Sequence, residues 1–277
     1  MNRLLTAAES VMAMDPDKIF TKVTETVVGQ DARVGEVVDF LFAATARVAA
    51  LAGGASASEV PANNVLLIMG PTGSGKTLTV RTACEAMGLG YREIDGAQLT
   101  GAGWHGADLD AELKPVAQDL KGDPRPYVVF IDEADKLSRG DKGKEEGFDP
   151  SPVLLRLLEA TGEHPVASSD SKASFTLDAD ALVFVMAGAF TGIDRQVRAR
   201  LRGGAGAACG FAADADAQGA AVLPEDEARA LAGPADLEAW GMPRELVGRV
   251  STVVSLRPLG ESAFREILDG GPHSVRA

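Results

Sequence analysis

The eight residues GPTGSGKT, at positions 70–77, constrain this chain more than any other stretch. They follow a continuous apolar run at residues 65–69, which is typical of a buried parallel strand. We predict a helix directly after them, over residues 76–87. A strand, a glycine-rich turn and a helix in this order form the phosphate-binding loop GxxxxGK[ST], or Walker A motif. The sequence therefore predicts an α/β protein with a nucleotide site at this turn.

The residue types in this loop suit phosphate binding. Glycines allow backbone N–H groups to converge on phosphate oxygens, and the following helix adds the positive end of its dipole. Lys76 supplies a cation to the outer phosphates, and Thr77 offers a hydroxyl to a magnesium ion. We predict that ATP is bound by Gly70, Pro71, Thr72, Gly73, Ser74, Gly75, Lys76 and Thr77.

A second motif, VVFIDE at residues 128–133, is the natural partner of the loop. It is an apolar strand that ends in two carboxylates. Asp132 is expected to hold magnesium together with Thr77, and Glu133 is expected to polarise the water that attacks the terminal phosphate. A strand ending in two acids is a weak signal alone, but after a phosphate-binding loop it predicts ATP hydrolysis.

The remaining pattern alternates strands with helices. This alternation predicts a parallel sheet with helices on both faces. The other expected strands are residues 91–94, 127–131, 182–186 and 253–256. The other expected helices are residues 16–26, 31–52, 108–120, 152–160 and 261–268.

Charge and cysteine content exclude several classes of protein. The chain has 27 basic and 40 acidic residues, a net charge of −13, which disfavours broad binding to nucleic acids or to anionic membranes. The two cysteines, Cys84 and Cys209, are too far apart in sequence for a zinc module or a disulfide scaffold. No apolar run reaches the length of a membrane span, and the first residues lack a signal-peptide pattern. We therefore expect a cytoplasmic protein.

The stretch GAGWHG, at residues 101–106, places the largest side chain, Trp104, among three glycines. Glycines leave the backbone free to move, so such a tryptophan either contacts another molecule or is held by a distant part of its own domain. The sequence leaves both alternatives open. An arginine such as Arg249, in GMPRELVGRV, is similarly either a solvated surface residue or an arginine finger for a neighbouring subunit.

Taken together, these motifs resemble the AAA+ protein unfoldases of the ClpX and HslU branch. The resemblance covers nearly the whole chain and is specific in its order of motifs. It rests on VVGQ, NVLLIMGPTGSGKTLTV, GAGWHGADL, VVFIDEADKLSR, VLLRLLEAT, AGAFTGID and GMPRELVGRVSTVVSL. It implies a P-loop AAA+ large domain over residues 1–257, with residues 258–277 only beginning the linker and the small C-terminal helical domain.

The resemblance also implies roles for individual residues. Arg249 corresponds to the arginine that acts in trans on the next subunit's nucleotide. Val27, Val28 and Gln30 correspond to residues that lie against the adenine. Trp104 and His105 fall in the loop that grips polypeptide in the central pore, and His105 replaces the aliphatic residue of the family.

Partners follow from the same resemblance. Members of the family form homo-hexamers, act on protein substrates and in part dock a ClpP-like peptidase. The docking tripeptide of the family, an aliphatic residue followed by Gly-Phe, is degenerate here as Cys209-Gly210-Phe211.

The strand end at Ala187 and Gly188 lacks the polar side chain that serves as a nucleotide sensor in the family.

The sequence therefore favours an ATPase that pulls polypeptide through the pore of a ring. One alternative is a regulatory or assembly AAA+ protein that binds ATP with little or no hydrolysis. A DNA-loading or helicase ATPase shares the core motifs, but the net charge weighs against it.

Overall fold

Five parallel strands form the central sheet, in the order β2-β3-β6-β1-β7. The computed structural model describes residues 2–61, 65–99, 109–137, 151–166, 175–205 and 223–269. The strands are β1 (Val65–Met69), β2 (Gly90–Asp95), β3 (Tyr127–Asp132), β6 (Leu182–Gly188) and β7 (Val250–Ser255). Every residue of β1 and β6 is buried, as expected for central strands covered on both faces. The predicted parallel α/β sheet is confirmed.

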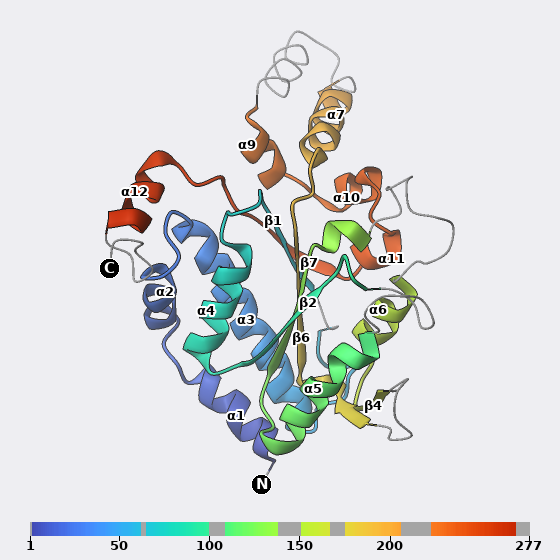
Figure 1. Cartoon of the computed structure of the whole chain (residues 1–277). Coiled ribbons are helices and arrows are strands. Elements are labelled where there is room, and N and C mark those ends of the chain that lie inside the picture. The colour runs from blue at the N-terminus through green and yellow to red at the C-terminus, as the bar shows by residue number, and fades with distance from the viewer. Residues whose placement is uncertain are drawn as a thin grey trace.

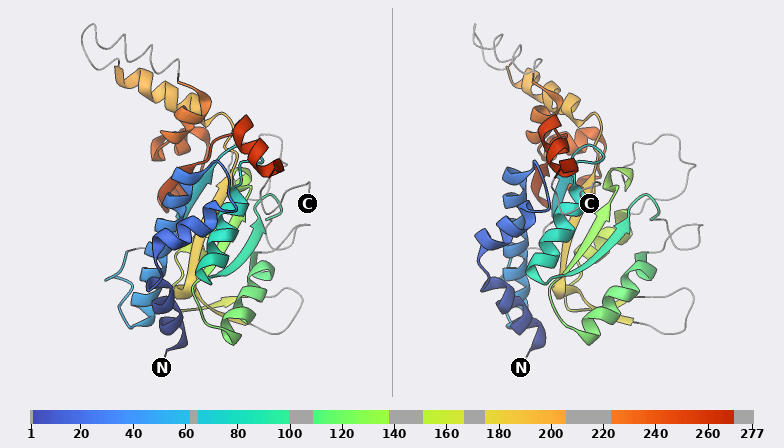
Figure 2. Two further views of the ribbon diagram at one scale, coloured as in Figure 1. Left: turned by 90° about the vertical axis from the view of Figure 1, so that its left-hand side faces the viewer. Right: turned by 60° about the vertical axis from the view of Figure 1, so that its left-hand side comes forward.

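Helices cover both faces of this sheet (Figure 2). On one face lie α1 (Arg3–Met12), α2 (Pro16–Thr24), α3 (Asp31–Ala52) and α4 (Lys76–Met87). On the other lie α5 (Leu109–Gly122) and α6 (Ser151–Leu158). The helix α3 turns Val34, Val37, Val38, Leu41 and Val48 into the core, at the spacing of one helical face.

The carboxyl ends of the five strands share one edge of the sheet, because the strands are parallel. The chain beyond this edge forms α7 (Ile193–Ala205) and α9 (Glu225–Ala230), which stand at the top of Figure 1. It then returns through α10 (Pro234–Trp240) and α11 (Arg244–Val247) to the start of β7, and ends in α12 (Glu261–Asp269). Ligands of open parallel sheets bind at this carboxyl edge.

Several features differ from the sequence expectations, among them the helix α7, which was not predicted. The helix α1 was not predicted, although Asn2 caps it with its side chain and Leu4, Ala8 and Val11 face the core at helical spacing. A separate antiparallel pair, β4 (Glu163–Val166) with β5 (Phe175–Asp178), was also not predicted. The last strand begins at Val250 rather than Val253, because it pairs with β1 from its first residue.

No helix in the described part of the chain combines the length and the apolar character that crossing a membrane requires.

Candidate functional site

The loop between β1 and α4 is shaped by its glycines. A Cβ atom on Gly70 would lie 2.9 Å from Ser74 Oγ and 3.0 Å from the backbone oxygen of Leu256, so no larger residue fits there. Gly73 and Gly75 have φ angles of +79° and +92°, which favour glycine. The loop therefore turns tightly enough to present its backbone N–H groups at the start of α4, where an anion binds well.

Lys76 lies across this loop. Its ammonium nitrogen donates hydrogen bonds to the backbone oxygens of Gly70, at 2.9 Å, and Pro71, at 3.1 Å. Burial lowers the pKa of Lys76, the carboxylates of Asp132 and Asp135 act to raise it, and the Arg229 guanidinium acts to lower it. The cation is thus held beside the loop by two neutral acceptors, which a phosphate oxygen can replace.

Thr77 and Asp132 meet, although they are 55 residues apart. The Thr77 hydroxyl donates to Asp132 Oδ2 at 3.0 Å, which joins the start of α4 to the end of β3. A hydroxyl and a carboxylate are oxygen ligands of the kind that magnesium takes, usually together with water and substrate phosphates. The residues present therefore fit a magnesium ion beside the phosphate-binding loop.

Glu133 follows Asp132 in a strained backbone conformation. Its φ angle is +50°, and its backbone N–H donates to Asp132 Oδ1 at 2.8 Å. Positive φ angles in residues other than glycine are uncommon and gather at functional sites, where the surrounding structure maintains them. The Glu133 side chain is exposed and lines the same cavity as Lys76 and Thr77.

This cavity has a volume of about 470 Å³, within the range of small-ligand sites. Its wall includes five residues to which the sequence assigned no binding role: Leu78, Asp135, Lys136, Gly188 and Ala189. Asp135 and Lys136 come just after VVFIDE, so their nearness to that motif was a usable signal. Gly188 ends β6 and Ala189 follows it; β6 lies beside β1, and this pairing is visible only in the fold.

Gln30 supports the loop from behind. Its side-chain amide donates to the backbone oxygens of Ser74, at 3.2 Å, and Arg257, at 2.8 Å, and accepts from the Arg257 N–H at 3.2 Å. Gln30 is buried, as is Val27, while Val28 is half-buried. The side chain of Gln30 thus ties three distant parts of the chain together.

We expect Gln30→Ala to lower the free energy of unfolding by about 1–3 kcal/mol, because it leaves the buried backbone oxygen of Ser74 and the partly buried backbone groups of Arg257 without their partner. Urea denaturation measures the effect. The matched control is Gln98→Ala, since the Gln98 side chain is exposed and, among the described residues, donates to a neighbouring carboxylate, Asp95. This control should change the free energy by less than about 0.5 kcal/mol. Equal losses in both variants would contradict the supporting role of Gln30.

Arg249 lies at the amino ends of the parallel strands, the end of the sheet opposite the cavity. Its backbone oxygen accepts from the N–H of Val65, the first residue of β1, at 2.8 Å. The glycine-rich loop follows the other end of β1, about 13 Å away at the rise of a parallel strand. The guanidinium instead forms an ion pair with Glu159. The structure does not bring Arg249 to its own chain's cavity.

Two groups of predicted residues lie outside the described part of the chain. They are Trp104 with His105, and the tripeptide Cys209-Gly210-Phe211.

A comparison with protein families identifies the fold of this site. The model described as "ATPase family associated with various cellular activities (AAA)" matches residues 66–203, which include the loop, both acids and the strand β6. The chain belongs to the AAA ATPase family. The matched residues include Lys76, Thr77, Asp132 and Glu133, which lie together in the cavity.

Similar curated proteins indicate which branch of the AAA family this chain resembles. The chain is 30% identical over 234 residues to the ATP-dependent Clp protease ATP-binding subunit ClpX of Bacteroides thetaiotaomicron, covering 78% of this chain and 54% of that protein. It is 32% identical over 225 residues to ClpX of Treponema denticola, covering 74% and 51%. ClpX 3 of Methylococcus capsulatus is 32% identical over 232 residues, covering 79% and 52%. This AAA ATPase is therefore ClpX-like, and it spans about half the length of these relatives.

Proposed function

We propose that this chain binds and hydrolyses ATP with magnesium, as the large domain of a ring-forming protein unfoldase. One observation carries the proposal. Lys76, Thr77, Asp132 and Glu133, which two separate sequence motifs supply, line one cavity at the carboxyl edge of the parallel sheet. The names of the relatives, which describe an ATP-binding subunit of a protease, support the same reading.

The residues of the chain divide the chemistry among them. Backbone N–H groups of residues 72–77 bind the phosphates, and Lys76 exchanges its two carbonyl acceptors for phosphate oxygens. Thr77 and Asp132 would hold magnesium, which supplies positive charge to the phosphates during transfer. Glu133 orients the attacking water by accepting a hydrogen bond from it, and its fixed backbone keeps the carboxylate at the cavity edge.

A ring would complete the site. Arg249 lies just before the strand β7, at the end of the sheet opposite its own cavity, so a phosphate contact requires a second copy of the chain. We propose that Arg249 reaches the cavity of the next subunit and stabilises charge there. The guanidinium, now paired with the half-exposed Glu159, is available for exchange because neither partner is deeply buried.

The mechanical part of the proposal rests on sequence. We propose that Trp104 and His105 grip polypeptide in the central pore of a hexamer. We also propose, on the same family resemblance, that Val27, Val28 and Gln30 lie against the adenine. A peptidase partner and a cytoplasmic location also remain predictions, since no described residue tests either.

Lys76→Ala tests nucleotide binding directly. We expect ATP affinity to fall about 10- to 150-fold, because a hydrogen bond to a charged group contributes about 1.5–3 kcal/mol. Isothermal titration calorimetry with magnesium and ATP measures the change. Lys121→Ala is the matched control, since Lys121 is exposed on α5, away from the loop. If both variants bind ATP with the affinity of the parent chain, the cavity is not the nucleotide site.

A further inference from the structure

Phe190 has an unusual backbone for its residue type. Within the described residues, only two positions other than glycine have a positive φ angle, Glu133 at 50° and Phe190 at 47°. For a bulky residue this conformation is strained, and glycine or asparagine would adopt it more easily. Phe190 is also 1% exposed, so its ring occupies a defined place in the core. We therefore attribute the stability of this strained backbone to the contacts that the buried Phe190 ring makes.

One side of the Phe190 ring lies against the wall of the phosphate cavity. Gly188 and Ala189, which precede it, line that cavity. A Cβ atom on Gly188 would lie 2.8 Å from Phe190 Cε2 and 2.7 Å from Asp135 Oδ1, so ring and wall are in close contact. The oxygen of Gly188 also accepts from the Gly70 N–H at 3.2 Å, which links this wall to the phosphate-binding loop.

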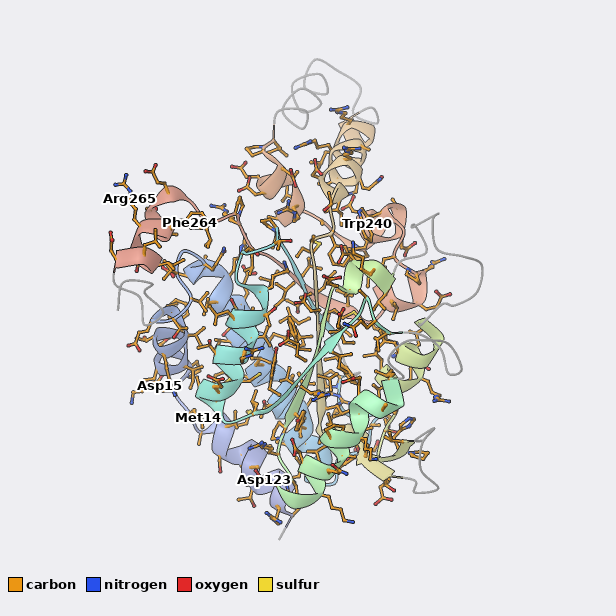
Figure 3. All side chains as sticks on the ribbon, in the orientation of Figure 1. Met14, Asp15, Asp123, Trp240, Phe264 and Arg265 are labelled. Atoms are coloured by element: carbon orange, nitrogen blue, oxygen red, sulfur yellow. The ribbon has the colours of Figure 1, made fainter. Side chains whose placement is uncertain are left out.

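The ring also contacts Trp240. Trp240 is the last residue of α10 and is labelled in Figure 3. The two ring centroids are 5.0 Å apart with planes inclined by 50°, a favourable tilted arrangement. The indole N–H of Trp240 donates to the backbone oxygen of Thr191 at 3.0 Å. Trp240 therefore contacts both the Phe190 ring and the backbone next to it. The strained turn at Phe190 is thus joined to α10 by two contacts.

A short, hydrogen-bonded segment leads from Trp240 to Arg249. The N–H groups of Gly241 and Met242 donate to the oxygen of Leu237, which closes α10 firmly. The Arg249 N–H donates to the oxygen of Leu246 at 2.9 Å, so the arginine backbone is fixed to α11. A displacement of Trp240 would therefore be passed along α11 rather than absorbed in a loose loop.

We propose that Phe190 and Trp240 are positioning residues that couple the occupancy of the phosphate cavity to the position of Arg249. The coupling rests on the proposed function, since it needs a nucleotide in the cavity and an acting arginine. In a ring, the nucleotide of one subunit would then set the arginine that the same subunit offers to its neighbour. The packed aromatic side chains of Phe190 and Trp240 suit this role, because a packed core shifts between discrete arrangements rather than deforming continuously.

The first experiment uses Trp240 as its own reporter. The chain holds two tryptophans, so Trp104→Phe leaves Trp240 as the single source of indole emission. We expect saturating magnesium and ATP to shift its emission spectrum, and we expect Lys76→Ala to abolish that shift. An unchanged spectrum while calorimetry shows ATP binding would overturn the coupling and leave the proposed function standing. Absence of ATP binding in the parent chain would overturn both.

The second experiment is kinetic. We expect Trp240→Leu to lower kcat about 5- to 150-fold with the ATP affinity unchanged, the usual size of a coupling between sites. Trp240→Phe, which keeps an aromatic ring, should recover much of the loss. In an Arg249→Ala background Trp240→Leu should cause no further loss, because both act through the same arginine. Tyr91→Leu, which breaks the Tyr91–Phe130 contact between β2 and β3, is the matched control and should leave kcat unchanged. Equal losses of kcat with and without Arg249 would overturn the proposal.

Discussion

Replacing Glu133 by glutamine is expected to slow ATP hydrolysis about 10²- to 10⁴-fold, the usual contribution of a positioned general base. Glutamine has the same shape, so the backbone hydrogen bond from residue 133 to Asp132 should persist. What is lost is the negative charge that orients the water and accepts its proton. Because Lys76, Thr77 and Asp132 remain, ATP affinity should stay within about twofold of the parent value.

Steady-state phosphate release and calorimetry measure the two quantities. The matched control is Glu93→Gln, since Glu93 lies at the surface of β2 and pairs with Arg81, away from the cavity. Hydrolysis at the parent rate in the Glu133 variant would show that another group activates the water. A parent chain that binds ATP without any turnover would instead support the regulatory alternative.

The candidate nucleotide site was predictable because its parts are local in sequence. A strand, eight loop residues and a helix start suffice to place Lys76 and Thr77, and one strand end places Asp132 and Glu133. Their meeting across 55 residues follows from parallel strands, which bring carboxyl ends to one edge. Burial of central strands makes them continuous apolar runs, so β1, β3 and β6 were also recognisable.

Other features depend on contacts that no local pattern contains. One partner of Gln30 is Arg257, 227 residues away, so the bond between them could not be inferred from either segment. The strain at Phe190 is equally invisible, since phenylalanine carries no sequence signal for a positive φ angle. The pair β4 and β5 was missed because each strand has four residues and Pro165 weakens the strand pattern.

The largest single loss of activity is expected from Arg249→Ala. An arginine that stabilises the transferring phosphoryl group contributes about 10³- to 10⁵-fold to kcat, so hydrolysis should fall by that factor. ATP affinity should stay within about twofold of the parent value, because the Arg249 backbone bonds the start of β1, whereas the chain's own loop follows the end of β1. Arg244→Ala is the matched control, since Arg244 is five residues earlier and its side chain is 85% exposed. This control should hydrolyse ATP at the parent rate.

Mixing two inactive variants separates a contact within one chain from a contact between chains. The Arg249→Ala chain keeps an intact cavity, and the Lys76→Ala chain keeps an intact arginine. In a mixed ring, the cavity of the first therefore meets the arginine of the second at some boundaries, and phosphate release should return there. The rate should depend on the mixing ratio and pass through a maximum, because neither chain alone supplies both parts. If mixed rings form, shown by co-purification of differently tagged chains, and no ratio restores turnover, Arg249 does not act on a neighbouring subunit.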